Sequence, residues 1–421
     1  MVPFTRIEGT LHAEGVPLDV LADAVGTPAY VYSAASVRAQ YARLDAALAP
    51  VPHRIHYACK ANASLGLLTL LRGIGCRIDV VSGGELFRAR TAGFAPQDII
   101  FGGVGKSAQE LREAIDAAVH VISIESEREL QLVNELSGAA GAVARVGIRV
   151  NPEITVETFH DYIKTGEKGG KFGVPFDEAL AVARLAHVLP HVTLVAIGMH
   201  IGSQLTEMAA YRHGIERLEG LIGALRDDGV TSLEHVDIGG GLYVPYDGEA
   251  PADLDGYASI VVPAVQRLGL ELIVEPGRYL VAEAGVLLAR VLYRKRSGGR
   301  DVLVTDTGMN DLLRPSHYDA YHRIEPVHAP RGAGRFDVVG PICESGDFLA
   351  LDRELADVDE GALLCVFTTG AYGMSMASNY NARPRPVEVL VDGNRWAVIT
   401  TREAYADLVR RETTSPAWRN S

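Results

Sequence analysis

The chain has 421 residues, of which 48% are hydrophobic and 22% are charged, so it can bury a large core and we expect two domains. A formal net charge of -13 and a sequence pI near 5.5 would repel nucleic acid and anionic membranes, which leaves a small molecule as the expected partner. The sequence shows neither a signal-peptide pattern nor an apolar run of about 18 residues, so we expect a cytoplasmic protein. Its four cysteines lack the close spacing of a zinc site or a disulfide framework, and no metal is predicted.

The chain begins with short extended runs and a helix-like stretch, PLDVLADAVG, and we expect residues 1–34 to pack with the C-terminal part. Eight short β-branched runs follow. The predicted strands cover residues 53–59, 76–82, 98–103, 119–125, 145–151, 194–201, 235–239 and 271–275.

Amphipathic helical patterns lie between most of these strands, for example at 107–118, 126–137 and 176–189. Two of them open with Ser followed three residues later by Glu, which is the signature of a capping box, at Ser107 and at Ser126. Strand and helix alternating eight times predict an α/β domain, a (β/α)8 TIM barrel, over residues 35–280. An open doubly wound sheet would produce a similar alternation and stays an alternative at this point.

The pattern changes after residue 280, where short extended runs are bounded by Gly, Asp and Asn with little helix between them. Residues 281–421 are therefore predicted to form a second, mainly β domain that includes the N-terminal segment. Within the barrel, the segment 155–174 carries the basic residues Lys164, Lys168 and Lys171, which fit either a mobile lid or a solvated loop, and we interpret it as a solvated loop.

Chemically versatile residues follow several of the predicted barrel strands. Each has a structural interpretation when taken alone: a lysine marks the point where a buried strand surfaces, three glycines make a tight turn, a histidine bonds within the core, and a glutamate pairs with an arginine. In a barrel, however, the C-terminal ends of all strands meet at one mouth. The residues concerned are Lys60, Asp79, His200, Ser203, Gly239, Gly240, Gly241, Glu275, Pro276, Gly277 and Arg278.

This combination fits a pyridoxal phosphate site. The amine of Lys60 can form a Schiff base with an aldehyde, and glycine-rich turns after the last two strands can hold a phosphate. The carboxylate of Glu275 can hold a ring nitrogen in its protonated form, and His200 can stack on the ring. We therefore predict pyridoxal 5'-phosphate as the cofactor.

The sequence also resembles the alanine-racemase-like (fold type III) pyridoxal phosphate decarboxylases, and among them the diaminopimelate decarboxylases. The resemblance covers nearly the whole chain. It is carried by the motifs GTPAYVYS, HYACKAN, DVVSGGEL, MHIGSQ, DIGGG, EPGR, MNDLLRPSHYDAYH, GPICESGD and GAYGMSMASNYN. It implies decarboxylation of meso-2,6-diaminopimelate to L-lysine and carbon dioxide, the last step of lysine biosynthesis.

The resemblance further implies roles for individual residues. Lys60 is the cofactor tether, His200 stacks on the ring, Glu275 pairs with the ring nitrogen, and the glycines of DIGGG and EPGR hold the phosphate. Cys343 is the proton donor and reaches in from the partner subunit of a homodimer. The residues implied to contact the substrate are Arg278, Arg314 and Tyr318 at its distal carboxylate, Glu344 at its distal amino group, and Tyr372, which also contacts the cofactor.

Four alternatives remain. An ornithine- or arginine-type decarboxylase is disfavoured because a substrate without a distal carboxylate would leave arginines unpaired. The hypothesis of a racemase has still less support. A catalytically silent regulatory homologue should have lost Lys60 or Cys343, and both are present. A sugar-phosphate barrel enzyme without a cofactor would not explain Glu275 or the β domain.

Overall fold

The computed structural model describes residues 3–154, 166, 169–329 and 331–419, so most of the segment 155–174, interpreted above as a solvated loop, lies outside the described residues. The chain forms two compact units. The first, the barrel unit, comprises Ser36–Glu283, and the second, the β unit, comprises Val2–Ala35 and Ala284–Ser421.

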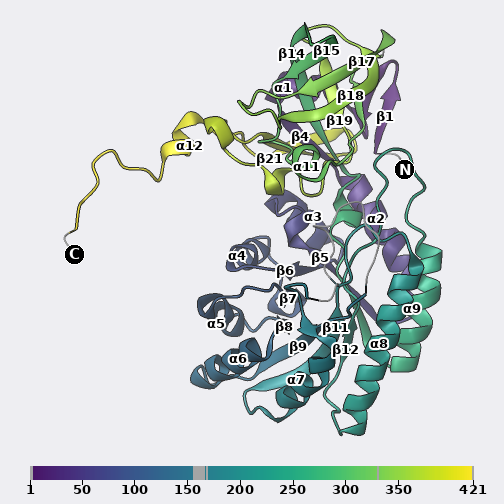
Figure 1. The fold of residues 1–421 in the computed structure, drawn as a ribbon, viewed down its shortest axis with the longest axis vertical. Coiled ribbons are helices and arrows are strands. Elements are labelled where there is room, and N and C mark those ends of the chain that lie inside the picture. Colours follow the sequence, from purple (N-terminus) through teal and green to yellow (C-terminus); the bar gives the residue numbers. More distant parts are fainter. Residues whose placement is uncertain (1–2, 155–165, 167–168, 330, 420–421) are drawn as a thin grey trace. The chain divides into compact units, whose positions relative to one another are not determined.

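Eight parallel strands form the centre of the barrel unit (Figure 1), and the last of them pairs with the first. Because the sheet closes on itself, the predicted (β/α)8 barrel is confirmed and the open doubly wound sheet is excluded. In order around the barrel the strands are β5 (His53–Ala58), β6 (Arg77–Val80), β7 (Ile99–Phe101), β8 (Val121–Ile124), β9 (Ala144–Asn151), β11 (Val192–Met199), β12 (His235–Asp237) and β13 (Glu271–Val274). A short β10 (Val174–Pro175) pairs in parallel with the end of β9.

The helices that connect these strands lie outside the barrel in Figure 1. They are α3 (Leu65–Gly73), α4 (Gly83–Thr91), α5 (Ala108–Asp116), α6 (Glu127–Ala139), α7 (Phe176–Val188), α8 (Met208–Asp227) and α9 (Leu254–Leu268). A further helix, α2 (Ala34–Leu48), precedes β5, and the short α10 (Arg278–Val281) follows β13. The interior is a packed core in which Ile100, Val121 and Ile273 contribute apolar side chains from three strands.

The two predicted capping boxes have different outcomes. At α5, Ser107 and Glu110 form both halves of the box. At α6, the Ser126 hydroxyl caps as predicted, but the Glu129 carboxylate accepts the N–H of Glu125 and pairs with Lys106 at 2.9 Å instead. The Lys106 side chain is fully buried there, so its charge requires this carboxylate as a partner.

The β unit is built around a mixed sheet that takes one strand from the N-terminal segment. This strand, β4 (Ala29–Ser33), pairs with β14 (Gly285–Ser297) on one side and β20 (Val387–Asp392) on the other. The remaining strands are β15 (Arg300–Thr305), β16 (Ile324–Pro326), β17 (Arg331–Val339), β18 (Phe348–Asp357), β19 (Leu363–Val366) and β21 (Arg395–Thr400). The predicted fold class, a barrel with a mainly β second part that includes the N-terminal segment, is confirmed.

The N-terminal elements contribute to the core of the β unit. They are β1 (Phe4–Ile7), β2 (Thr10–Ala13), β3 (Val16–Pro17) and α1 (Leu18–Val25). Leu11, Leu18 and Leu21 pack there with Val286 and Val389. The burial of these side chains is the main force that holds the N-terminal segment to the C-terminal strands.

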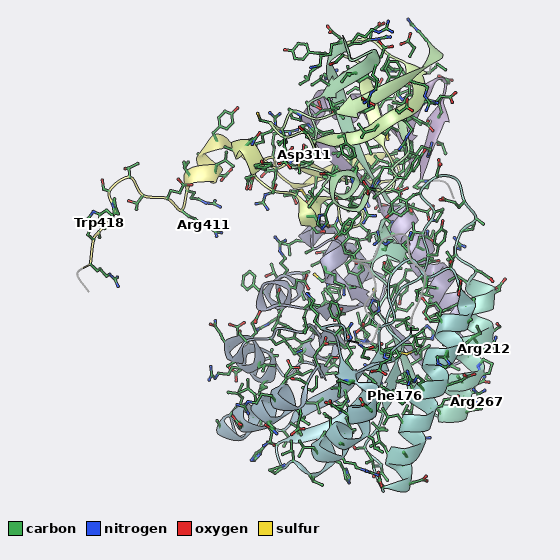
Figure 2. The ribbon with its side chains drawn as sticks, in the orientation of Figure 1. Phe176, Arg212, Arg267, Asp311, Arg411 and Trp418 are labelled. Carbon is green, nitrogen blue, oxygen red and sulfur yellow. The ribbon has the colours of Figure 1, made fainter. Side chains whose placement is uncertain are left out.

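Two short helices complete the β unit, α11 (Arg314–Tyr318) and α12 (Tyr405–Val409). Beyond α12 the chain runs outward as an extended segment on which Trp418 is 89% exposed (Figure 2). Within the described residues, every helix is too short or too polar to cross a lipid bilayer.

Candidate active site

Three ionisable groups interact at the C-terminal ends of adjoining barrel strands. Lys60 lies in a 3-10 turn, Cys59–Ala61, directly after β5, and Asp79 lies near the end of the neighbouring β6. Glu275 follows β13, which pairs with β5 on the other side. Burial, and after it the charge of Glu275, raise the pKa of Asp79 to about 7 against the opposing effect of the Lys60 ammonium. The site therefore concentrates acidic groups around one lysine.

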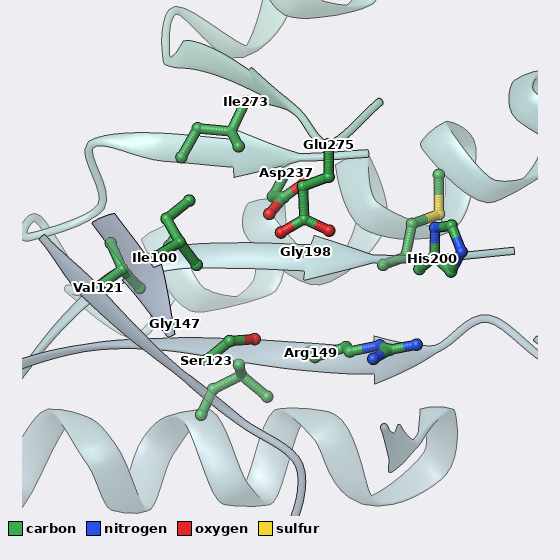
Figure 3. Close-up of a pocket in the computed structure, with 13 residues that line it drawn as sticks. Ile100, Val121, Ser123, Gly147, Arg149, Gly198, His200, Asp237, Ile273 and Glu275 are labelled. Atoms are coloured by element: carbon green, nitrogen blue, oxygen red, sulfur yellow. The ribbon is translucent and has the colours of Figure 1, made fainter. Parts of the chain in front are cut away.

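A third acid, Asp237, ends β12 beside Glu275, and the two carboxyl groups lie within hydrogen-bonding reach of each other. Burial raises the pKa of Asp237 to about 7, and burial together with the Asp237 charge raises the pKa of Glu275 well above its usual range. Both line a cavity of about 30 Å³ inside the barrel, together with Arg149 and His200 (Figure 3). A cavity of that size accommodates little more than a water molecule or two.

The imidazole of His200 is held in one orientation by the glycine turn after β12. Its Nδ1 atom accepts the N–H of Gly240 at 3.1 Å, so in the neutral ring the proton is on Nε2. Burial lowers the pKa of His200 well below its usual range, and the charges of Lys60 and Arg149 add to the effect. The site therefore presents a neutral imidazole.

The three glycines of the DIGGG turn lie too close to other backbone atoms to carry side chains. A Cβ atom on Gly239 would lie 2.7 Å from the carbonyl oxygen of Met199, and one on Gly241 would lie 2.6 Å from that of Gly202. A Cβ atom on Gly240 would collide with the carbonyl oxygen of Glu275. The turn thus exposes backbone alone, as a bound phosphate requires.

Arg278 is the first residue of α10 and is 6% exposed. Its guanidinium donates to the Ser203 hydroxyl at 3.2 and 3.3 Å and to the Tyr246 hydroxyl at 2.8 Å. Ser203 and Arg278, both predicted from strand ends, are therefore brought into contact.

The remaining predicted site residues belong to the β unit. Arg314 and Tyr318 are the first and last residues of α11, with the Arg314 guanidinium 5.7 Å from the Tyr318 ring centre. Cys343 and Glu344 lie in the loop between β17 and β18. Cys343 is the exposed member of the four cysteines, and its N–H donates to the Asn381 side chain at 2.7 Å. The Glu344 carboxylate is hydrogen-bonded to Tyr380.

Tyr372 has a backbone φ of +57°, a left-handed conformation that is uncommon for a tyrosine. The following residue, Gly373, is pressed against Tyr30, since a Cβ there would lie 2.7 Å from the Tyr30 hydroxyl oxygen. That hydroxyl donates to the carbonyl oxygen of Asp311 at 2.6 Å. The buried Tyr30 thus supports the loop that carries Tyr372.

Comparison with known proteins identifies the family. Residues 34–282 match the family described as pyridoxal-dependent decarboxylase, pyridoxal binding domain. The chain is 44% identical to the diaminopimelate decarboxylase of Pseudomonas aeruginosa over 99% of this chain and 100% of the relative. It belongs to the diaminopimelate decarboxylase family. The diaminopimelate decarboxylase of Vibrio cholerae is similar, with 43% identity over 97% of this chain and 98% of that protein.

Solved structures agree with this family. The diaminopimelate decarboxylase from Helicobacter pylori, complexed with L-lysine, superposes with a TM-score of 0.91 at 38% identity, covering 94% of this chain and 99% of that one. The lysine/ornithine decarboxylase from Vibrio vulnificus has a TM-score of 0.78 at 21% identity, covering 89% of this chain and 96% of that one, and shares the fold.

The cofactor of this decarboxylase family is pyridoxal phosphate, and the barrel unit has side chains that fit it. The amine of Lys60 suits the aldehyde of the cofactor, and the flat, neutral ring of His200 suits a face of its ring. The carboxyl group of Glu275 suits the ring nitrogen, and the glycine turn, which has no side chains, suits the phosphate. Among the described residues, no cluster of three or more His, Cys, Asp or Glu side chains is arranged to hold a metal ion.

The predicted barrel residues thus lie at one end of the strands, but sequence reasoning missed several of their partners. Asp237 is the last residue of β12, so the rule that identified Asp79 could have identified it. Arg149 lies near the end of β9 and pairs with Glu125 at 2.8 Å. Tyr246, whose hydroxyl accepts a hydrogen bond from Arg278, lies in a loop, and no local sequence pattern indicates its role.

Proposed function

We propose that this chain is a pyridoxal phosphate-dependent decarboxylase that converts meso-2,6-diaminopimelate to L-lysine and carbon dioxide. The observation that carries the proposal is the arrangement of Lys60, His200, Glu275 and the DIGGG turn at one end of the barrel, in a chain that matches diaminopimelate decarboxylases along its whole length. The L-lysine in the Helicobacter pylori relative is the expected reaction product.

When bound, pyridoxal phosphate supplies a protonated ring that accepts the electron pair left behind by the departing carboxyl group. The side chains of the protein position the cofactor and polarise its ring. Lys60 provides the tethering amine, and the buried carboxyl group of Glu275 provides the partner for the ring nitrogen. Asp79 adds further negative potential at this end of the barrel, which favours a protonated ring nitrogen.

His200 contributes an uncharged surface for the ring. Its low pKa keeps the imidazole neutral, so it can stack on the ring without opposing the positive charge of the ring nitrogen. Its bond from Gly240 ties the stacking group to the phosphate turn, so both are oriented together. We assign Ser203, Pro276, Gly277 and Arg278 to the same phosphate side of the cofactor site.

Residues of the β unit complete the proposed reaction. Cys343 would protonate the α-carbon after carbon dioxide leaves, and Tyr372 would contact cofactor and substrate. Arg314 and Tyr318, together with Arg278, would bind the distal carboxylate of the substrate, and Glu344 its distal amino group. A guanidinium matches a carboxylate with two parallel donors, and a carboxylate complements an ammonium group, so this set suits an amino acid that is charged at both ends.

The proposal includes a cytoplasmic homodimer in which Cys343 acts in the active site of the partner subunit. Binding energy from the distal end of the substrate would orient the bond to be broken. Loss of Arg314 or Glu344 should therefore lower turnover as well as affinity.

The test supplies the purified protein and pyridoxal phosphate with meso-diaminopimelate, ornithine or arginine in separate reactions, and quantifies carbon dioxide and the amine product. We expect L-lysine from the first substrate only, and no turnover from K60A with any substrate. Release of carbon dioxide from ornithine or arginine instead would be consistent with the cofactor site but would overturn the assignment of Arg314 and Glu344. No turnover of any substrate by the wild-type protein would favour a regulatory homologue.

A further inference from the structure

The carboxyl groups of Asp237 and Glu275 lie side by side at the ends of the adjacent strands β12 and β13 (Figure 3), within hydrogen-bonding reach of each other. Two ionised carboxylates have acceptors only, so a hydrogen bond between these two groups requires a proton on one of them. The N–H of Gly239 donates separately to Oδ1 of Asp237 at 2.7 Å, so this carboxyl group is anchored to the glycine turn as well.

The charges around the pair also favour a single proton. Asp79 approaches from β6 and disfavours a second negative charge, whereas Lys60 and Arg149 favour ionisation. Arg149, however, is bound to Glu125 at 2.8 Å, which uses part of its charge. His200, which lines the same cavity, is neutral. Two ionised carboxylates in contact inside the barrel would therefore lack adequate compensation.

We propose that Asp237 and Glu275 share one proton, and that Asp237 takes it whenever Glu275 faces the ring nitrogen of the cofactor as a carboxylate. The proton moves along the hydrogen bond between them from a Glu275 oxygen to an Asp237 oxygen, so the pair keeps one negative charge throughout. The cofactor half of this inference rests on the proposed function. Asp237 is thus a positioning residue: it holds Glu275 in place and, through Gly239, anchors the glycine turn.

Asparagine at position 237 provides the decisive variant, because its shape matches that of a protonated aspartate. Its side-chain oxygen can accept the Gly239 N–H, and its NH2 group can donate to the Glu275 carboxylate without a shared proton. In D237A both bonds are lost. If the negative charge of Asp237 were what mattered, D237N would be as defective as D237A.

The first measurement uses cofactor-free protein and isotope-edited infrared spectra with 13C-labelled aspartate and glutamate carboxyl groups, at a pH about 1.5 units above 7, where the other acids near the pair are ionised. We expect the wild-type protein to show the band of a protonated carboxyl group, and D237N and E275Q to lack it. D79N should keep the band. The absence of this band from the wild-type protein, or its loss in D79N instead of D237N, would overturn the shared proton.

The second measurement compares cofactor affinity, from the visible absorbance of the bound cofactor, and turnover. We expect D237N to stay within about threefold of the wild-type protein, whereas D237A should lose roughly 10- to 100-fold, as is usual when the partner of a binding group is removed. Equal losses in D237N and D237A, with both shown to be folded by circular dichroism, would overturn the positioning role. The infrared measurement does not depend on enzymatic activity. It therefore tests whether the pair shares a proton even if the proposed reaction proves wrong.

Discussion

The carboxylate of Asp347 accepts the backbone N–H of Ile342 at 2.6 Å, immediately before Cys343 in the chain. Its other oxygen accepts the N–H of Met309, also at 2.6 Å. A Cβ atom on Gly340 would lie 2.5 Å from Oδ2 of Asp347, so the loop is packed tightly around this side chain. One buried carboxylate therefore fixes the backbone that precedes Cys343.

We expect D347A to destabilise the β unit and to lower turnover. The substitution leaves two backbone N–H groups without their acceptor, at a cost of about 1–3 kcal/mol for each buried donor. Urea denaturation measures the stability, and the decarboxylation assay measures turnover. The control is D352N, since Asp352 pairs with Arg335 on the surface, where solvent and salt screen the pair and its loss should change stability little. Equal effects of the two variants would contradict the positioning role of Asp347.

The glycine turn allows a second prediction. We expect G240A to lose cofactor affinity by roughly 100-fold or more, because the added methyl group collides with the backbone carbonyl of Glu275, which cannot move without disturbing β13. Titration of the cofactor-free protein with pyridoxal phosphate, followed by absorbance, measures the affinity. In the control G223A the new Cβ meets nothing within 4 Å, and a helical alanine should raise stability by about 0.5–1 kcal/mol. Full cofactor binding by G240A would show that the turn does not hold the phosphate.

Cys343 provides a third prediction. C343A should keep the absorbance of the bound cofactor and lose turnover by about 10²- to 10⁴-fold, which is the usual contribution of a positioned proton donor. Mixing C343A with K60A tests the shared site: random pairing of subunits would restore about one quarter of the wild-type activity if each site takes Lys60 from one subunit and Cys343 from the other. No recovery on mixing would contradict the shared site, and retained turnover by C343A alone would identify another proton donor.

The barrel and most of the candidate site in it could be predicted from the sequence because both depend on local patterns. Short β-branched runs mark the strands, and a residue that ends a run lies at the barrel mouth whatever the details of packing. Lys60, His200 and Glu275 were found in this way, and the structure places all three in one electrostatic environment.

Contacts between distant segments could not be predicted in the same way. The bonds from Met309 and Ile342 to Asp347 join two segments of the chain through an acceptor whose own motif does not indicate its partners. Glu129 satisfied the capping-box pattern, but its carboxylate pairs with the buried Lys106. In both cases the need to satisfy buried polar groups, which depends on the whole fold, decided the outcome.

The last prediction concerns pH and the opposite end of the barrel, where buried histidines lie near the starts of strands. The Nε2 atoms of His120 and His235 are 3.0 Å apart, so only one proton fits between the two rings. Burial lowers the pKa of His120 to about 3 and also lowers that of His235, and the nearby charges of Arg54 and Arg145 add to both shifts. Glu234 and Glu271 oppose the shifts in part.

A histidine whose pKa is lower in the folded than in the unfolded state binds fewer protons when folded, so stability rises with pH in the interval between the two values. The stability is thus fully present above the unfolded pKa of about 6.5 and is lost progressively below it. Between pH 7.5 and 5.0 we expect a loss of about 2 kcal/mol for each histidine that stays neutral.

Urea denaturation at a series of pH values measures this slope. The variant H120Q keeps a hydrogen-bonding side chain but removes one titrating group, so its stability should fall less steeply with decreasing pH. The control H213Q replaces a histidine whose side chain is 63% exposed and should leave the slope of the wild-type protein unchanged. If H120Q and the wild-type protein showed the same slope, the acid sensitivity would arise elsewhere, because a neutral, buried His120 must contribute to it.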